Sequence, residues 1–109
     1  MIKVSISSNK ENNINYIFVS GHANYSVKGS DIVCAAVSTA MYISVKLIEK
    51  VCPKYSFKEN EEVATMELTI IETNEFTNIA LDNLVETLAS LEKDYKKYIS
   101  INYKWLIHN

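Results

Sequence analysis

The residues best suited to chemistry lie close together in this chain of 109 residues. The sequence has only two glycines, Gly21 and Gly29, and both fall in the stretch that also holds His22, Asp31 and Cys34. A cysteine thiolate is a strong nucleophile, and a histidine beside it can accept its proton. These residue types indicate a nucleophilic thiol site in which Cys34 attacks and His22 acts as the base.

A long helix is expected directly after these residues. Asp31 is a plausible N-cap, the residues after it are rich in Ala, Val, Ile and Met, and Pro53 prevents continuation, so the pattern predicts a helix over residues 32–51. Cys34 would then be the third helical residue. At that position unpaired backbone N–H groups and the positive end of the helix dipole stabilise a thiolate.

Each of these side chains also has a structural interpretation. Cys34 could be a small buried hydrophobic residue, and His22 could be a hydrogen-bonded structural histidine. Asp31 could be only a cap, or it could orient His22 or bind substrate N–H groups. Ser38 lies one helical turn after Cys34, so its hydroxyl could contact the sulfur or a helix carbonyl. The residues alone leave these alternatives open.

The second cysteine, Cys52, is interpreted as structural. Eighteen residues of helix at about 1.5 Å each would hold Cys34 and Cys52 roughly 27 Å apart, which excludes an intrachain disulfide and a zinc site that uses both. His22, Asp31 and Cys34 are too few good ligands by themselves. We therefore expect no metal and no other cofactor.

Charge and hydropathy limit the remaining classes of function. Eleven Lys, no Arg and thirteen acidic residues give a net charge of -2, without a basic block that could bind phosphates, so no direct contact with nucleic acid is expected. The first ten residues do not resemble a secretory signal, and the longest uncharged stretch, residues 32–45, is too short to span a bilayer. The expected location is the cytoplasm, away from membranes.

The hydrophobic pattern predicts one α+β domain over residues 1–109. Alternating apolar residues indicate strands over residues 2–7, 14–20, 55–58, 63–71 and 99–107, with a turn at residues 60–62. A second helix is predicted from apolar residues three and four apart: Phe76, Ala80, Leu84, Leu88, Leu91 and Tyr95. The order ββαββαβ favours a mainly antiparallel sheet with two helices packed on one face. The first helix is apolar on more faces than one sheet can cover, which predicts a homodimer.

The glycine-rich stretch resembles the two-part motif of the Prp family of bacterial ribosomal-processing cysteine proteases, here Gly21-His22-Ala23 and, after a loop, Gly29-Ser30-Asp31-Ile32-Val33-Cys34-Ala35-Ala36-Val37-Ser38. The strong match covers residues 21–38. Residues 88–99 are more weakly similar to the final helix and strand of that family. Residues 60–62 stand where many members have glycines, which puts the hairpin turn in question.

The resemblance implies a cysteine endopeptidase that removes a short N-terminal extension from the precursor of the twenty-seventh protein of the large ribosomal subunit. It implies Cys34 as nucleophile, His22 as base, a homodimer, a loop that moves to admit the peptide, and an apolar groove beside the thiol. Backbone N–H groups near the start of the helix, with the turn at Gly29 and Ser30 as a possible addition, could then stabilise an oxyanion. The alternative is a non-catalytic ribosome-assembly or peptide-binding module. A thiol redox sensor is disfavoured because Cys52 is too distant to resolve an oxidised Cys34.

Overall fold

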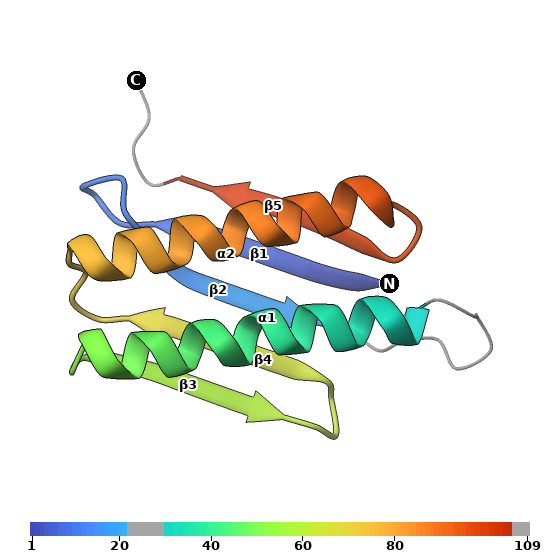
Figure 1. Ribbon diagram of the computed structural model, residues 1–109, viewed down its shortest axis with the longest axis horizontal. Helices are drawn as coiled ribbons and strands as arrows, with labels where there is room; N and C mark the ends of the chain where they lie inside the picture. The colour runs from blue at the N-terminus through green and yellow to red at the C-terminus, as the bar shows by residue number, and fades with distance from the viewer. Residues whose placement is uncertain (22–29, 106–109) are drawn as a thin grey trace.

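The computed structural model describes residues 1–21 and 30–105. The elements follow the predicted order ββαββαβ: β1 (Ile2–Ser8), β2 (Ile14–Ser20), α1 (Ser30–Val51), β3 (Tyr55–Asn60), β4 (Thr65–Ile70), α2 (Glu75–Asp94) and β5 (Ile99–Lys104). The strands form one sheet in the order β3-β4-β2-β1-β5 (Figure 1). Neighbouring strands are antiparallel except β1 and β5, which run parallel and place Val4 opposite Ile101.

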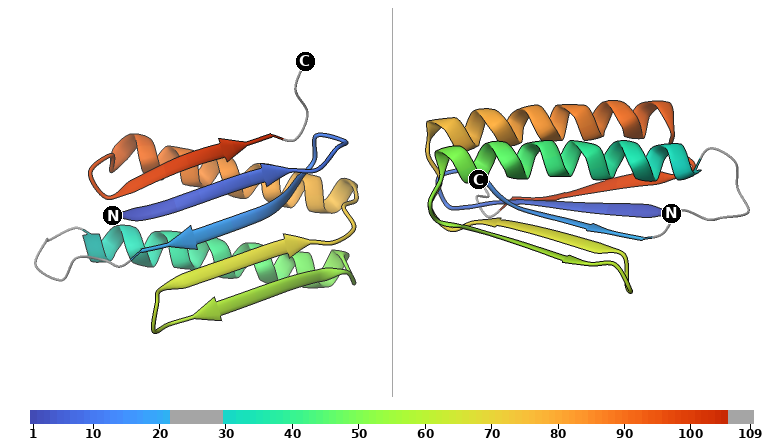
Figure 2. Two further views of the ribbon diagram at one scale, coloured as in Figure 1. Left: turned by 180° about the vertical axis from the view of Figure 1, so that it is seen from behind. Right: turned by 60° about the horizontal axis from the view of Figure 1, so that its bottom comes forward.

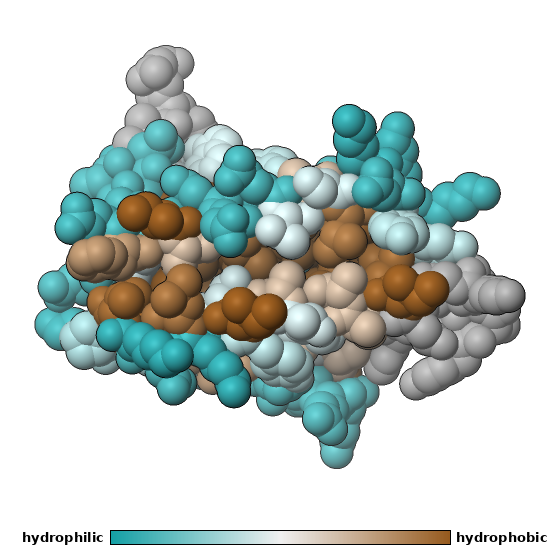
Figure 3. All heavy atoms as spheres, viewed as in Figure 1, coloured by the Kyte–Doolittle hydropathy of each residue, from teal (hydrophilic) through white to brown (hydrophobic). Residues whose placement is uncertain are grey.

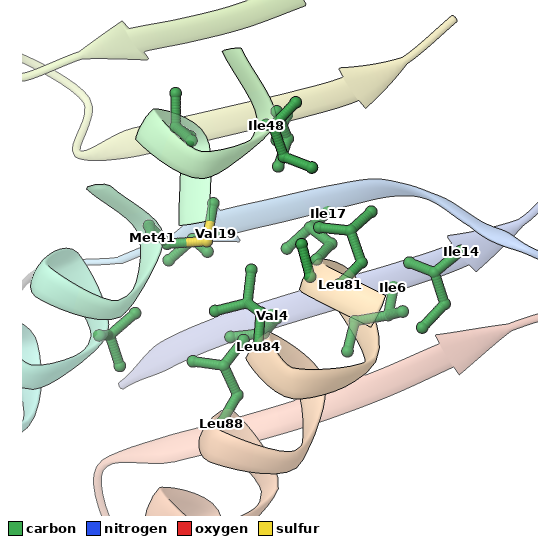
Figure 4. Packing of buried hydrophobic residues seen from close by; sticks show 14 of the residues in the cluster. Val4, Ile6, Ile14, Ile17, Val19, Met41, Ile48, Leu81, Leu84 and Leu88 are labelled. Atoms are coloured by element: carbon green, nitrogen blue, oxygen red, sulfur yellow. The ribbon is translucent and has the colours of Figure 1, made fainter. Parts of the chain in front are cut away.

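Both helices lie on the same face of the sheet (Figure 2). This arrangement confirms the predicted α+β fold with two helices on one face of a mainly antiparallel sheet. Successive side chains of a strand point to opposite faces, so Ile2, Val4 and Ile6 are buried beneath the helices while Lys3 is exposed on the other side. Figure 4 shows the packed layer between helices and sheet, to which these residues contribute: Val4, Ile17, Val19, Met41, Leu84 and Leu88.

Helix α1 is by length and composition apolar enough to cross a membrane. In this fold its apolar stripe packs against the sheet instead. Val33, Val37, Met41, Val45 and Ile48 recur every three or four residues, and each is at most 8% exposed. The stripe therefore makes α1 a core helix, in agreement with the sequence-based interpretation of this segment as a buried helix.

Three sequence-based expectations, two about element bounds and one about burial, need correction. Helix α1 begins at Ser30 rather than at residue 32, because Ser30 and Asp31 suit a first helical turn as well as they suit a cap. Phe76 was expected in the core stripe of α2 but is 56% exposed, since Thr77 begins the buried stripe. Strand β5 ends at Lys104 rather than continuing through residue 107, and residues 106–109 lie outside the described part of the chain.

The predicted second hairpin is present, with its turn at residues 61–64 rather than 60–62. Asn60 pairs with Thr65 at the last position of the ladder, and the Asn60 side-chain oxygen accepts hydrogen bonds from the backbone N–H groups of Glu62 and Val63, at 3.0 and 3.4 Å. Ala64 completes the turn in the left-handed region, with φ 52°. An asparagine and one left-handed alanine thus form a turn that contains no glycine.

Candidate active site

Cys34 lies near the N-terminal end of α1. This end of the helix lies on the same side of the molecule as the end of β2 (Figure 1). Because α1 begins at Ser30, Cys34 is the fifth helical residue rather than the third, and Asp31 is the second residue of the helix rather than its N-cap. The thiol is therefore one turn inside the helix, behind the unpaired N–H groups of the first turn. The Cys34 side chain is partly buried and packs against the hydrophobic core.

Gly21 follows the last residue of β2 and is fixed by its surroundings. Its φ is 116°, a conformation that L side chains rarely adopt, and a Cβ added there would lie 2.3 Å from the carbonyl oxygen of Met1. Its backbone N–H donates to the carbonyl oxygen of Ala64 at 3.1 Å. Gly21 therefore brings the chain past the β3–β4 turn at the position where the predicted site segment begins.

The predicted site residues fall into two groups. Gly21, Cys34 and Ser38 all border one cavity, so the structure brings these three together. Ser38 lies one turn after Cys34 on the same face of α1, as predicted. Ser30 and Asp31 form the first residues of α1. The remaining predicted site and motif residues lie outside the described residues: His22, Ala23 and Gly29.

The cavity beside Cys34 has a volume of about 190 Å³ and lies under the first half of α1. Its apolar lining comes from β1, β2, α1 and the start of β4: Ile2, Val19, Val37 and Met66. Apolar cavities of about 150 Å³ accommodate a benzene ring in proteins. This cavity can therefore accept one large apolar side chain next to the thiol.

Part of the cavity lining is polar. It comes from Glu59, Asn60 and Glu61, where β3 ends and the turn begins, together with Tyr42 of α1. The Tyr42 hydroxyl donates a hydrogen bond to the Glu59 carboxylate. This hydrogen bond raises the pKa of Tyr42 from 10.0 to about 12, with further contributions from burial and from the charges of Glu59 and Glu61. The hydroxyl thus stays protonated at neutral pH.

Most of the residues that line the cavity were not predicted from the sequence. Tyr42 had a detectable signal, because it follows Cys34 and Ser38 at spacings of four residues and so continues their helix face. Ile2, Val19 and Met66 had none, since they meet the helix only through the order of the strands in the sheet. The family resemblance implied an apolar groove beside the thiol, and this cavity is the candidate for it.

Chemically, the arrangement presents a partly exposed thiol next to an apolar recess. A peptide whose large side chain fills the recess would hold a neighbouring carbonyl carbon near the sulfur, and such positioning is a major part of catalysis. The described residues supply a free thiol, that of Cys34, and the recess. The predicted base, His22, directly follows Gly21 in sequence, and Gly21 borders the same cavity.

Comparisons with known proteins identify the family to which the chain is similar. Residues 1–100 match the family model described as "Cysteine protease Prp". The ribosomal processing cysteine protease Prp of Mycoplasma genitalium is 32% identical over 102 residues, which cover 94% of this chain and 95% of the relative. The protein of the same name from Staphylococcus aureus is 29% identical over 108 residues, which cover 95% of this chain and all of the relative.

The fold agrees as well. A crystal structure of the essential ribosomal processing protease Prp from S. aureus with a substrate peptide superposes with a TM-score of 0.88 at 26% identity, over 95% of this chain and all of that one. A second structure of that protease, with a covalently linked product peptide, gives a TM-score of 0.84 over the same shares of the two chains. The predicted enzyme class is thereby confirmed: the chain belongs to the Prp family of cysteine proteases.

Proposed function

We propose that this protein is a cysteine endopeptidase that removes a short N-terminal extension from the precursor of the twenty-seventh protein of the large ribosomal subunit during ribosome assembly. The observation that carries the proposal is the thiol of Cys34 beside an apolar cavity that Gly21, the residue before His22, also borders. The names of the relatives support ribosomal processing, and the S. aureus protease binds a substrate peptide.

In the proposed mechanism, His22 accepts the proton of the Cys34 thiol, and the sulfur attacks the carbonyl carbon of the cleaved peptide bond. The C–N bond then breaks, the amine leaves with the proton from His22, and a thioester remains on Cys34. Water then attacks the thioester while His22 takes a proton from that water. The carboxylate product leaves, and the free thiol of Cys34 is regenerated. One peptide bond and one water molecule are consumed in each turnover.

The residues at the start of α1 have supporting roles in this proposal. Backbone N–H groups near the start of α1 are the proposed donors to the oxyanion of the tetrahedral intermediate, because N–H groups in the first turn of a helix have no intrahelical partner. The turn at Gly29 and Ser30 is proposed to add to them. Asp31 is proposed to orient His22 or to receive substrate N–H groups. Ser38 is proposed to support the sulfur, and Gly21 and Ala23 to shape the chain around the base.

The exposed apolar surface of the two helices supports a homodimer. Along α1, Ile32, Ile43 and Leu47 are 46–64% exposed, and on α2 Ile79 is 67% exposed. Apolar side chains gather along the helix-bearing face in Figure 3. Large exposed apolar patches commonly mark interfaces. We propose that a second copy of the chain covers this face.

The dimer can be tested by measuring molar mass with light scattering during size-exclusion chromatography. Ile43→Lys should convert a dimer into a monomer without loss of helix content. Val63→Lys is the matched control, because Val63 is 59% exposed but lies in the β3–β4 turn, away from the two helices. A monomeric wild-type protein, or a dimer in Ile43→Lys as stable as the wild type, would contradict this part of the proposal.

The proposed setting is the cytoplasm, with residues 1–109 acting as one domain. Cys34 and Cys52 are both free and lie near opposite ends of α1. A reducing compartment keeps a nucleophilic thiol available, whereas an oxidising one would favour intermolecular disulfides. This proposal predicts that added thiol reductant maintains activity and that oxidants which attack thiols remove it.

The decisive experiment is intact-mass analysis of the host's own precursor after incubation with the wild type, with Cys34→Ala and with Cys52→Ala. We expect the wild type and Cys52→Ala to cut the precursor at one bond and Cys34→Ala to leave it whole. Cys52 is the matched control because it is a buried cysteine whose sulfur contacts the carbonyl oxygens of Lys54 and Glu72, away from the cavity. If no variant cuts the precursor while all of them bind it, the protein is an assembly module instead.

The role of His22 can be tested without a substrate. The rate at which iodoacetamide modifies Cys34 should exceed that of a free cysteine at neutral pH and should fall at least about tenfold in His22→Ala, because the thiolate is the reactive form. Circular dichroism would verify that the variant is folded. Equal rates in the wild type and in His22→Ala would contradict the assignment of His22 as the partner of the thiol.

A further inference from the structure

One face of α1 lines the cavity beside the thiol. Cys34, Ser38 and Tyr42 are spaced four residues apart, so they lie on successive turns of that face, and all three border the cavity. The eight residues from Cys34 to Tyr42 span about 12 Å of helix. The Cys34 sulfur and the Tyr42 ring thus border one cavity from positions about two helical turns apart.

Contacts with β3 hold the Tyr42 ring in place. The ring meets Phe57 edge to face, with 6.4 Å between the ring centres and an interplanar angle of 81°. Its hydroxyl donates to the carboxylate of Glu59, two residues further along β3 on the same face of the strand. A ring fixed at two points by a neighbouring strand forms a rigid wall, even though Tyr42 itself is 38% exposed.

We propose that Tyr42 is a specificity-determining residue, because its ring forms one wall of the cavity beside the thiol and so limits the size of the substrate side chain that fits beside the cleaved bond. This inference rests on the proposed protease activity and deepens it. A volume of about 190 Å³ suits a leucine or phenylalanine side chain, whereas a bicyclic aromatic side chain would meet the Tyr42 ring. Truncation of Tyr42 extends the cavity toward Phe57 and Glu59.

The test uses peptides that match the cleavage site and differ only in one residue next to the cut bond, which carries leucine, phenylalanine or naphthylalanine. The wild type is expected to cleave the phenylalanine peptide at least tenfold better than the naphthylalanine peptide, measured as kcat/KM. In Tyr42→Ala that ratio should fall at least tenfold. In Tyr42→Phe, which keeps the ring, it should stay within threefold of the wild-type value.

A control variant tests whether the change in specificity comes from loss of the cavity wall or from loss of any tyrosine that is hydrogen-bonded to a glutamate. Tyr16 of β2 donates to Glu67 of β4 at 2.5 Å. Its side chain lies on the face of the sheet opposite Ile17 and the helices. Tyr16→Ala should leave the ratio of the two peptides unchanged within twofold. An unchanged ratio in folded, active Tyr42→Ala, or an equal change in Tyr16→Ala, would overturn the proposal.

A second measurement distinguishes failure of this inference from failure of the proposed function. Chloroacetamides that carry a benzyl or a naphthylmethyl group alkylate Cys34 without any proteolysis, and mass spectrometry gives the two rates. Tyr42→Ala should raise the naphthylmethyl rate at least fivefold relative to the benzyl rate. If the wild type cuts no peptide yet this shift occurs, the protease proposal fails and the role of Tyr42 stands; with no shift, the role of Tyr42 fails as well.

Discussion

The backbone N–H of Gly21 donates to the carbonyl oxygen of Ala64 at 3.1 Å, and this bond ties the end of β2 to the turn between β3 and β4. Both residues border the cavity beside Cys34. Both also have positive φ, 116° for Gly21 and 52° for Ala64. One end of the candidate site therefore depends on two backbone conformations that side chains disfavour, and the two positions should respond to substitution in opposite directions.

Gly21→Ala should destabilise the protein by at least about 2 kcal/mol, because the new Cβ combines a disfavoured φ with an approach of 2.3 Å to the Met1 carbonyl oxygen. The thermal midpoint should fall by roughly 10 °C. Ser20→Ala, one residue earlier in β2, is the control and should shift the midpoint little. A midpoint for Gly21→Ala within a few degrees of the wild type would contradict the described conformation.

Ala64→Gly should stabilise the protein by up to about 1 kcal/mol. Glycine removes the strain of a left-handed alanine, and the larger entropy of the unfolded glycine chain offsets part of the gain. Ala64→Val should have the opposite effect, because a β-branched side chain tolerates this region least. Urea unfolding of the three proteins gives the order, and a glycine variant less stable than the valine variant would refute the turn geometry.

Asn74 connects the two helices. Its side-chain oxygen accepts from the backbone N–H groups of Phe76 and Thr77 at the start of α2, and its side-chain nitrogen donates to the carbonyl oxygen of Val51, the last residue of α1. Asn74→Ala removes all three bonds and should reduce the free energy of unfolding by about 2 kcal/mol.

Asn74→Asp distinguishes the contribution of the α2 cap from that of the hydrogen bond to α1. Aspartate keeps the acceptor for the N–H groups of α2 but has no donor for Val51, so it should retain roughly half of the stability that Asn74→Ala loses. Chemical denaturation of both variants at neutral pH provides the measurement. Equal losses in the alanine and aspartate variants would mean that the contact to α1 accounts for the whole effect.

Stability should decline in strong alkali partly because of Tyr16. Burial, followed by the hydrogen bond to Glu67 and the charge of that carboxylate, raises the pKa of Tyr16 from 10.0 to about 12. Since the unfolded chain releases this proton near pH 10 and the folded protein holds it to about pH 12, the contribution is complete below pH 10 and is lost as the pH rises through this window. Tyr16→Phe should make the decline shallower in urea titrations. A decline as steep as that of the wild type would exclude Tyr16 as a cause.

Local patterns were sufficient to predict the order of the elements. Alternation in residues 2–7 and spacing of three and four in α2 report burial on one face, and the structure confirms both, with Ala80, Leu84 and Leu88 buried. Phe76 was misplaced because a residue in the first turn of a helix can satisfy the spacing and still point past the end of the core. The start of α1 was misplaced by two residues because Ser30 and Asp31 suit both a cap and a first turn.

The site was predictable only where the motif is contiguous. Cys34 and Ser38 were found from helix spacing, and the structure places both on the cavity. Met66 and Ile2 reach the same cavity because β4 and β1 flank β2 in the sheet. Strand order depends on pairing over long distances in the chain, which local periodicity does not encode. The wall formed by Tyr42 likewise depends on where β3 lies beneath α1.

The parallel pairing of β1 with β5 also determines when the recess beside the thiol is completed during folding. Ile2 lies opposite Ile99, so β1 gains its second neighbour only when residues 99–104 fold against it. Ile2 is also part of the recess beside the thiol. Contacts this distant in sequence form late and slowly. The wall of the recess that contains Ile2 therefore reaches its final support only when β5 pairs with β1.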